Sequence, residues 1–159
     1  IQTGHGVPTL QSVIDCFKTD RDSLIIADGG MKSTGDIAKA IAAGADLVMC
    51  GSMFAGTDES PGEVFQASDN KKYKVYRGMA SVEAQHDWKG SHNSVEGIST
   101  TIPYRGSVVN ILELMKKQLS SACSYTGARN LTEFKQKKNF IIQSNSSQIE
   151  SSTHILNRR

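Results

Sequence analysis

The sequence predicts an α/β fold with a parallel sheet. Two short apolar runs, residues 23–28 and 45–51, have the length and composition of strands that are buried on both faces. Residues 34–44 lie between them and have the pattern of a helix, with small polar residues first, an alanine-rich body and Gly44 as C-cap. About 22 residues separate the two strands, which is typical of a parallel βαβ unit.

Further elements flank this unit. Residues 9–18 place apolar side chains at helical spacing and predict an amphipathic helix before the first strand. After Gly56 the α/β cadence ends, and residues 57–107 contain many turn formers and few apolar runs. A long amphipathic helix is predicted over residues 107–127, with Gly127 as its stop. Its apolar side carries Val108, Ile111, Leu112, Met115, Leu119 and Ala122.

The C-terminal part is less regular. Residues 130–137 predict a short helix and residues 139–144 an extended segment. The polar, low-complexity residues 143–159 are expected to form a mobile tail.

Composition excludes several classes of protein. The 159 residues suit one domain or half of a larger one, and 38% hydrophobic with 21% charged residues predicts a folded chain. A net charge of +2 is too small to indicate nucleic acid, and no apolar stretch approaches the ~20 residues of a membrane span. The opening residues lack Met and a signal-peptide pattern, and we expect them to start within a loop.

The cysteines indicate a reducing compartment. Cys16, Cys50 and Cys123 show no paired spacing, so neither a disulfide framework nor a zinc site is expected. We therefore expect a cytoplasmic protein without a bound metal.

Glycines follow both predicted strands directly, as Asp28-Gly29-Gly30 and as Gly51-Ser52. A doubly wound sheet and a (β/α)8 barrel both contain such units, and barrels often hold phosphate in the loops after two neighbouring strands. Glycine allows close approach and exposes backbone N–H groups, so one phosphate could lie in both loops. The alternative is that these glycines only form tight turns. A dinucleotide fingerprint is disfavoured, because "GHGVPT" has Thr9 at the third glycine position and no strand before it.

Asp28 ends the first strand, where a carboxylate is costly unless it has a partner. Facing a ligand, it could accept hydrogen bonds from two ribose hydroxyls. The alternative is an aspartate that caps a helix or forms a turn.

Four segments carry a resemblance to the IMP dehydrogenase/GMP reductase family. They are residues 25–63, "YKVYRGMAS" (73–81), "VEGISTTIPYRG" (95–106) and "SACSYTGARNL" (121–131). The resemblance covers roughly residues 3–142 and implies the C-terminal part of a (β/α)8 TIM barrel with C-terminal helices. It implies one domain over residues 1–142 with an active-site flap at about 82–106, completed by the N-terminal part of the same barrel, and a homotetramer. It also implies a purine nucleoside monophosphate bound beside a nicotinamide cofactor.

The resemblance assigns roles to individual positions. It implies that Asp28 binds ribose, that the hydroxyl of Tyr76 reaches the phosphate, and that Tyr125 and Ser81 lie at the cofactor. Tyr125 could instead pack on the core at the end of its helix, and Met79 could be core filler. The implied phosphate cradle is Gly30, Gly51 and Ser52, with Gly29 as a further implied substrate-binding residue. The implied purine-reading backbone is Gly78, Met79 and Ala80.

Catalysis requires residues beyond these. The family's nucleophilic cysteine and its neighbouring threonine would lie before residue 1, so we interpret the three cysteines as structural and do not expect this chain to be catalytic alone. Glu96 is the acid–base candidate. In the reductase pattern it relays a proton to the departing ammonia, because an amine is a poor leaving group unless it is protonated. The alternative is a solvated loop glutamate.

The flap favours one branch of the family. Residues 82–94 contain no arginine, so the Arg-Tyr pair that activates water in the dehydrogenases is missing. We therefore expect an NADPH-dependent GMP reductase, which converts GMP to IMP and ammonia, although Asn93 stands where many reductases have arginine. The alternatives are an IMP dehydrogenase with NAD and a monovalent cation, a non-catalytic nucleotide-binding barrel, and an unrelated FMN-phosphate barrel. The histidines His86 and His92 are expected to be exposed, and Trp88 either stacks on the cofactor or packs the flap down.

Overall fold

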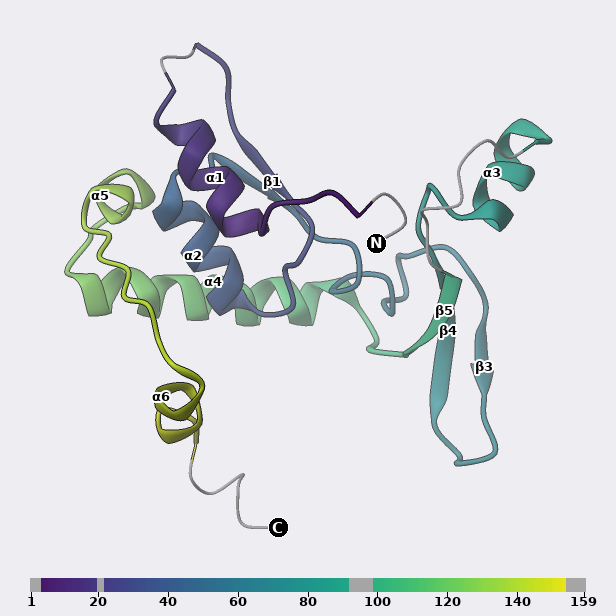
Figure 1. Cartoon of the computed structure of the whole chain (residues 1–159). Coiled ribbons are helices and arrows are strands. Elements are labelled where there is room, and N and C mark those ends of the chain that lie inside the picture. Colours follow the sequence, from purple (N-terminus) through teal and green to yellow (C-terminus); the bar gives the residue numbers. More distant parts are fainter. Residues whose placement is uncertain (1–3, 20–21, 92–98, 154–159) are drawn as a thin grey trace.

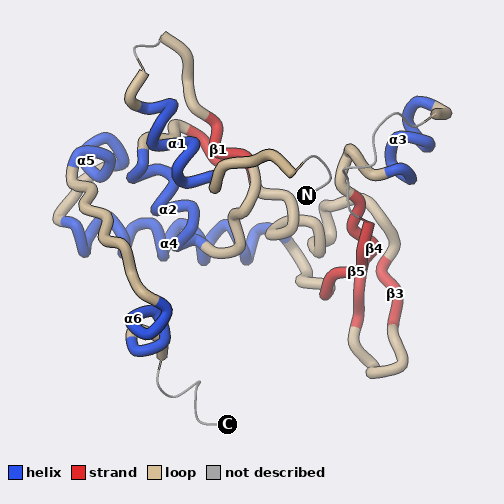
Figure 2. The backbone as a smooth tube through the Cα atoms, viewed as in Figure 1, coloured by secondary structure: helices blue, strands red, loops and turns tan. Residues whose placement is uncertain are grey.

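The computed structural model describes residues 4–19, 22–91 and 99–153. Figure 1 shows that the molecule has two parts, which are connected through α4 and the loops near the start of that helix. One part combines a short parallel sheet with helices, and the other is a small antiparallel sheet that carries α3. The tube view separates the same parts by secondary structure (Figure 2).

The predicted parallel unit is confirmed. Its elements are α1 (Thr9–Phe17), β1 (Ile26–Asp28), α2 (Thr34–Ala43) and β2 (Leu47–Met49), in that order. The two strands pair in parallel over their whole length, with Asp28 opposite Met49 at their carboxyl ends. The loops after both strands therefore leave the sheet at the same edge.

Burial of both strand faces was predicted, and it is wrong for the described chain. Ala27 is 1% exposed against the helices, whereas Ile26 is 52%, Leu47 54% and Met49 51% exposed on the other face. Side chains alternate across a strand, so only every second residue points at α1 and α2. Two strands cannot close a barrel, and no third parallel strand lies in the described ranges to cover the second face.

Helix α2 has well-defined ends. Ser33 and Asp36 form a reciprocal capping box at its start, and Gly44 ends it with φ +125°. Gly44 also allows Phe17 of α1 to approach, because a Cβ at this position would overlap the Phe17 side chain. The core around α2 consists of Val13, Ala27, Met31, Ile37, Ala40, Ile41, Ala42, Ala43, Ala45, Met53, Ala128 and Phe134.

The predicted C-terminal helices are also confirmed. The long helix α4 (Val108–Thr126) ends at Gly127 in the left-handed conformation, and α5 (Leu131–Gln136) follows. Both helices pack on α2, where the Thr34 hydroxyl donates to Gln118 Oε1 at 2.5 Å. Apolar residues of α4 that face this core are Met115, Leu119, Ala122 and Cys123.

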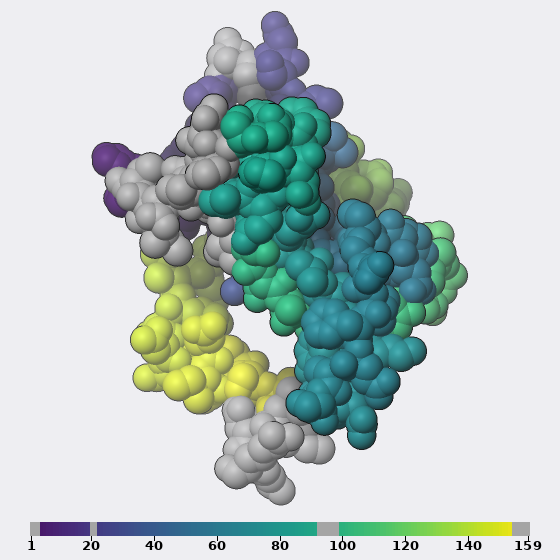
Figure 3. All heavy atoms as spheres, turned by 90° about the vertical axis from the view of Figure 1, so that its right-hand side faces the viewer, coloured from purple at the N-terminus to yellow at the C-terminus, as the bar shows by residue number. Residues whose placement is uncertain are grey.

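The sequence did not predict the antiparallel sheet. It consists of β3 (Val64–Gln66), β4 (Lys72–Arg77) and β5 (Ser99–Pro103), in the order β3-β4-β5. Helix α3 (Val82–Lys89) leaves the end of β4 and lies in the segment expected to be an irregular flap. In the space-filling view, α3 and the hairpin occupy the near face, while the yellow C-terminal residues lie to one side (Figure 3).

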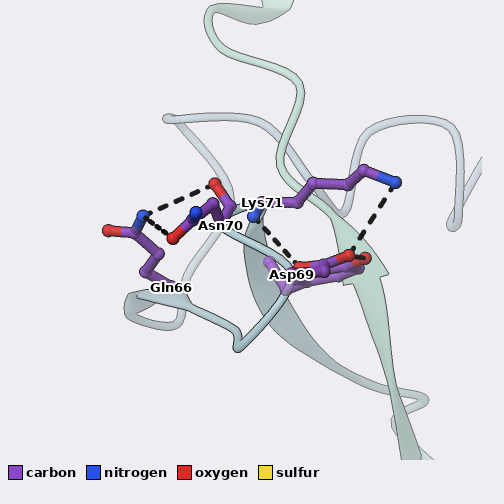
Figure 4. Close-up of polar contacts among 5 residues, drawn as sticks. Gln66, Asp69, Asn70 and Lys71 are labelled. Carbon is purple, nitrogen blue, oxygen red and sulfur yellow. Dashed lines mark hydrogen bonds and ion pairs between the residues drawn. The ribbon is translucent and has the colours of Figure 1, made fainter.

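Local contacts form the tip of the β3–β4 hairpin (Figure 4). Asn70 adopts φ +61°, and the backbone N–H of Lys71 donates to Asp69 Oδ1 at 3.0 Å. Gln66 Nε2 reaches the Asn70 carbonyl oxygen at 3.4 Å. The Asp-Asn pair is a typical turn signal, and together with the alternation in "KYKVYR" it could have revealed the hairpin.

The predicted tail contains a helix that the sequence did not indicate. Helix α6 (Asn145–Glu150) is capped by the Ser144 side chain, which accepts a hydrogen bond from the backbone of Ser147. None of the helices within residues 4–19, 22–91 and 99–153 is long and apolar enough to cross a membrane.

We predict that Gly44→Ala destabilises the full-length protein by about 2–4 kcal/mol, because it adds left-handed strain to overpacking against Phe17. Gly35→Ala is the matched control. A Cβ at Gly35 meets only the Ser33 hydroxyl at an ordinary 3.5 Å, so the change should be below about 1 kcal/mol. Urea unfolding measures both variants, and equal stability of the two would contradict this account of the α1–α2 packing.

Candidate functional site

The carboxyl ends of β1 and β2 open into a cavity of about 500 Å³. Its walls come from the loop after β1, the turn after β2 and the end of β4, three segments that are distant in sequence. The lining residues are Asp28, Gly29, Gly30, Met31, Lys32, Met49, Gly51, Ser52, Tyr76, Arg77, Gly78 and Met79. Eight of the nine residues predicted to bind substrate are therefore adjacent in one cavity, and Ala80 is the exception.

Backbone conformation explains the glycines after β1. Gly29 has φ +88° and Gly30 has φ +81°, in a region that residues with a Cβ rarely adopt. This conformational requirement is one reason for glycine at both positions. It does not exclude a ligand, because both glycines also line the cavity.

Close approach explains Gly51. A Cβ on Gly51 would lie 3.1 Å from the Tyr76 hydroxyl oxygen, which is tighter than an ordinary contact. The turn after β2 is closed at Gly51, whose carbonyl accepts from the N–H groups of Phe54 at 3.1 Å and Ala55 at 3.0 Å. Tyr76 thus places a hydroxyl donor beside a backbone turn, which is a suitable arrangement for an anion.

Asp28 is exposed at the end of β1 and lines the cavity. The helix that follows is capped by Ser33, so the N-cap explanation for Asp28 is wrong. No ion-pair or hydrogen-bond partner of its carboxylate is found among the described residues. The carboxylate is therefore positioned to accept hydrogen bonds from a ligand.

Two cationic residues of the cavity were missed by the sequence reasoning. Lys32 lies in the loop after β1, and Arg77 ends β4. The Arg77 guanidinium forms an ion pair with Asp87 of α3 across exposed surface. Arg77 follows Tyr76 directly in the motif "YKVYRGMAS", so the motif that predicted Tyr76 as a site residue could also have indicated Arg77. These cations complement a phosphate better than glycines alone do.

Residues 78–81 separate into two groups. Gly78 and Met79 line the cavity, and Met79 is 72% exposed, so the interpretation as core filler is wrong. Ala80 lies outside the lining, and its carbonyl accepts from Gln85 Nε2 at 3.0 Å. Ser81 is 1% exposed and caps α3 through its hydroxyl, so its side chain is not on the surface of the site.

A second cavity of about 480 Å³ adjoins the first. The two share Tyr76, Arg77 and Met79 as a common wall. The second cavity is completed by Pro61, Gly62, Glu63, Val75 and Ala84. The two cavities therefore meet at the end of β4.

Other predicted site residues lie elsewhere. Glu96, His92 and Asn93 fall outside the described residues. Tyr125 is 94% exposed on α4, so it does not pack against the core as the alternative required. Trp88 is 71% exposed on α3, with Lys89 Nζ 4.8 Å from its ring centroid, and His86 is exposed on the same helix. Across the described ranges, no group of three or more His, Cys, Asp or Glu side chains could hold a metal.

Cys50 lies between β2 and Gly51 and is the cysteine nearest to the cavity. It is half-buried rather than fully buried in the strand, and burial raises the pKa of its thiol. A raised pKa disfavours the thiolate, so Cys50 is not prepared as a nucleophile. Cys16 and Cys123 are also free thiols.

A parallel β/α unit with a cavity at the strand carboxyl ends places the chain among the α/β proteins, barrels and doubly wound sheets alike, that bind ligands at this edge. The model of the IMP dehydrogenase / GMP reductase domain matches residues 1–154. The chain belongs to this family, and its fold is part of the family's TIM barrel.

Individual relatives come from both branches of the family. An inosine-5'-monophosphate dehydrogenase of Nitrosopumilus maritimus is 41% identical over 96% of this chain and 35% of the relative. A GMP reductase of Lactobacillus delbrueckii subsp. bulgaricus is 46% identical over 90% of this chain and 42% of the relative. The chain therefore spans about a third to two fifths of these relatives, and the identities do not separate the branches.

A solved structure agrees with the fold. A GMP reductase variant from Trypanosoma brucei, in complex with guanosine 5'-monophosphate, matches with a TM-score of 0.87 and 38% identity. The match covers 96% of this chain and 32% of the other.

Proposed function

We propose that the full-length protein is a GMP reductase, which uses NADPH to convert GMP to IMP and ammonia. The observation that carries this proposal is the cavity in which Asp28, the two glycine loops and Tyr76 meet. It offers a carboxylate for ribose hydroxyls and a glycine-lined cradle with a hydroxyl and two cations for phosphate. The Trypanosoma brucei neighbour, a GMP reductase in complex with guanosine 5'-monophosphate, adds support from a relative.

The absence of arginine from residues 82–94 favours the reductase. A dehydrogenase must activate water to hydrolyse its covalent purine intermediate, whereas a reductase must protonate a leaving amine. IMP dehydrogenase, with NAD and a monovalent cation, is the second candidate because relatives of both names match equally well. The two functions therefore differ in their acid–base chemistry at the purine. The dehydrogenase needs a base for water, and the reductase needs an acid for the leaving amine.

The nicotinamide cofactor would supply the hydride. The second cavity gives room for another ligand beside the first, with Met79 and Arg77 in the common wall. Ser81 does not fit as a direct cofactor contact because its side chain is buried. Tyr125 fits better, since it is free to contact a neighbouring subunit of a homotetramer.

The N-terminal part of the same barrel is the proposed cover of the exposed strand face. Ile26, Leu47 and Met49 point away from the helices and are exposed in the described chain, as residues of an incomplete barrel interior would be. That part would also bring the nucleophilic cysteine and its threonine. We propose the cytoplasm as the location, in keeping with the three free cysteines.

The proposal predicts opposite outcomes in two assays on the full-length protein. With GMP, NADPH consumption and ammonia release should proceed together in equal amounts, while IMP should not reduce NAD. The measurement is absorbance at the reduced-nicotinamide band, with product nucleotides separated by chromatography. NAD reduction with IMP and formation of XMP would instead establish the dehydrogenase, and inactivity in both with retained GMP binding would establish a non-catalytic binder.

Asp28→Ala should weaken GMP binding while the fold survives. Loss of hydrogen bonds from ribose hydroxyls to a charged carboxylate costs about 1.5–3 kcal/mol, or roughly ten- to a hundredfold in affinity. Asp22→Ala removes the same charge from the loop before β1 and is the control. Calorimetric titration measures both, and unchanged affinity in Asp28→Ala would leave Asp28 as a turn residue.

Glu96→Gln should lower turnover of GMP by about 10²- to 10⁴-fold, the usual contribution of general acid–base catalysis. GMP affinity should hardly change, because the proposed contacts to phosphate and ribose come from residues 28–52 and from Tyr76 and Arg77. Glu83→Gln in α3 is the matched control and should leave turnover unchanged. A loss of affinity without a loss of turnover would assign Glu96 to positioning of purine or cofactor instead.

A further inference from the structure

Lys74 is almost fully buried in the middle of β4, with a relative exposure of 2%. Its ammonium donates to the carbonyl oxygens of Thr57 at 2.7 Å and Ser60 at 2.6 Å. No carboxylate pairs with it among the described residues, so two backbone carbonyls replace the water that this charge has lost. Lys74 does not line either cavity.

The Thr57 carbonyl connects Lys74 to the turn after β2. The backbone N–H and the hydroxyl of Thr57 both donate to the Phe54 carbonyl, at 3.0 and 2.7 Å. The N–H of Phe54 in turn donates to the Gly51 carbonyl at 3.1 Å. A series of hydrogen bonds therefore runs from the buried ammonium through Thr57 and Phe54 to Gly51 of the predicted phosphate cradle.

Strand β4 completes the connection from the other side. Tyr76 lies two residues after Lys74, so the two side chains leave the strand on the same face. The Tyr76 hydroxyl oxygen would be 3.1 Å from a Cβ at Gly51. Lys74 and Tyr76 thus contact the two ends of one turn, Lys74 at Thr57 and Tyr76 at Gly51.

We propose that Lys74 is a positioning residue for phosphate recognition, which fixes the distance between the Tyr76 hydroxyl and the backbone of the Gly51 turn. This inference rests on the proposed function, because it assumes that Tyr76 and the turn bind the phosphate of a purine mononucleotide. Lys74 acts through Tyr76 and does not touch the ligand. Its removal frees β4 to move relative to the turn, and the Tyr76 hydroxyl then loses its place beside Gly51.

The test compares GMP with guanosine in the full-length protein, because guanosine lacks only the phosphate. Tyr76→Phe should raise the Kd of GMP about tenfold and leave the Kd of guanosine unchanged. Lys74→Met should do the same. In the double variant the two effects should not multiply, because Tyr76 contributes nothing once Lys74 is lost. Lys72→Met, an exposed lysine on the same strand, is the matched control and should bind GMP normally.

Thr57→Val provides a second route if Lys74→Met does not fold. It removes only the hydroxyl that donates to Phe54 and leaves Lys74 in place. The Kd of GMP should rise a few-fold, again without a change for guanosine. An unchanged preference for GMP over guanosine in this variant would overturn the proposed connection.

The outcomes separate the two proposals. Multiplied effects in the double variant, or an equal loss of GMP and guanosine affinity in Lys74→Met, would overturn the positioning role and leave the phosphate cradle intact. An unchanged preference for GMP in both Tyr76→Phe and Gly51→Ala would overturn the cradle itself, and the role of Lys74 with it.

Discussion

The parallel pairing of β1 with β2 is the constraint on which the candidate site depends. Only parallel strands bring two successive carboxyl ends, at Asp28 and Met49, to the same edge of a sheet. Helix α2 makes this pairing possible by returning the chain between Ser33 and Gly44, and its ends are fixed by a capping box and a left-handed glycine. The glycine loops become neighbours as a consequence, although residues 31–50, which include α2 and β2, separate them in the sequence.

The loop of residues 57–60 joins the antiparallel sheet to the rest of the molecule. Besides its contacts with Lys74, its Glu59 carboxylate accepts from the backbone N–H of Val108 and from the Ser107 hydroxyl, each at 2.8 Å. These hydrogen bonds at the start of α4 lower the pKa of Glu59, with the Val108 contribution the largest. Asp58 accepts from the Tyr104 hydroxyl at 2.6 Å, next to the end of β5. One short loop therefore determines where β4, β5 and α4 lie relative to the cavity.

Sequence reasoning succeeded where one local pattern determines the structure. The helical spacing of apolar residues and the glycine stops located α1, α2, α4 and α5, and the family resemblance located the cavity residues. It failed for the β3–β4 hairpin, whose strands are short and whose outer residues are largely exposed, so the apolar signal is weak. It also missed Lys32 and Arg77, because an exposed cation resembles any solvated residue until the fold places it at a cavity. Burial of both strand faces was also predicted wrongly, because an apolar run does not show which of its faces the rest of the fold covers.

The groups that line the cavity differ in how firmly the fold holds them in place. The backbone turns and Tyr76 present donors that the fold already holds in place, so binding of the proposed ligand there would cost little conformational entropy. Lys32 and Arg77, by contrast, are long side chains on the surface, and Arg77 is engaged by Asp87 of α3. Arg77 thus lines the cavity and also pairs with Asp87 of α3, the helix that precedes the proposed acid–base glutamate in the sequence.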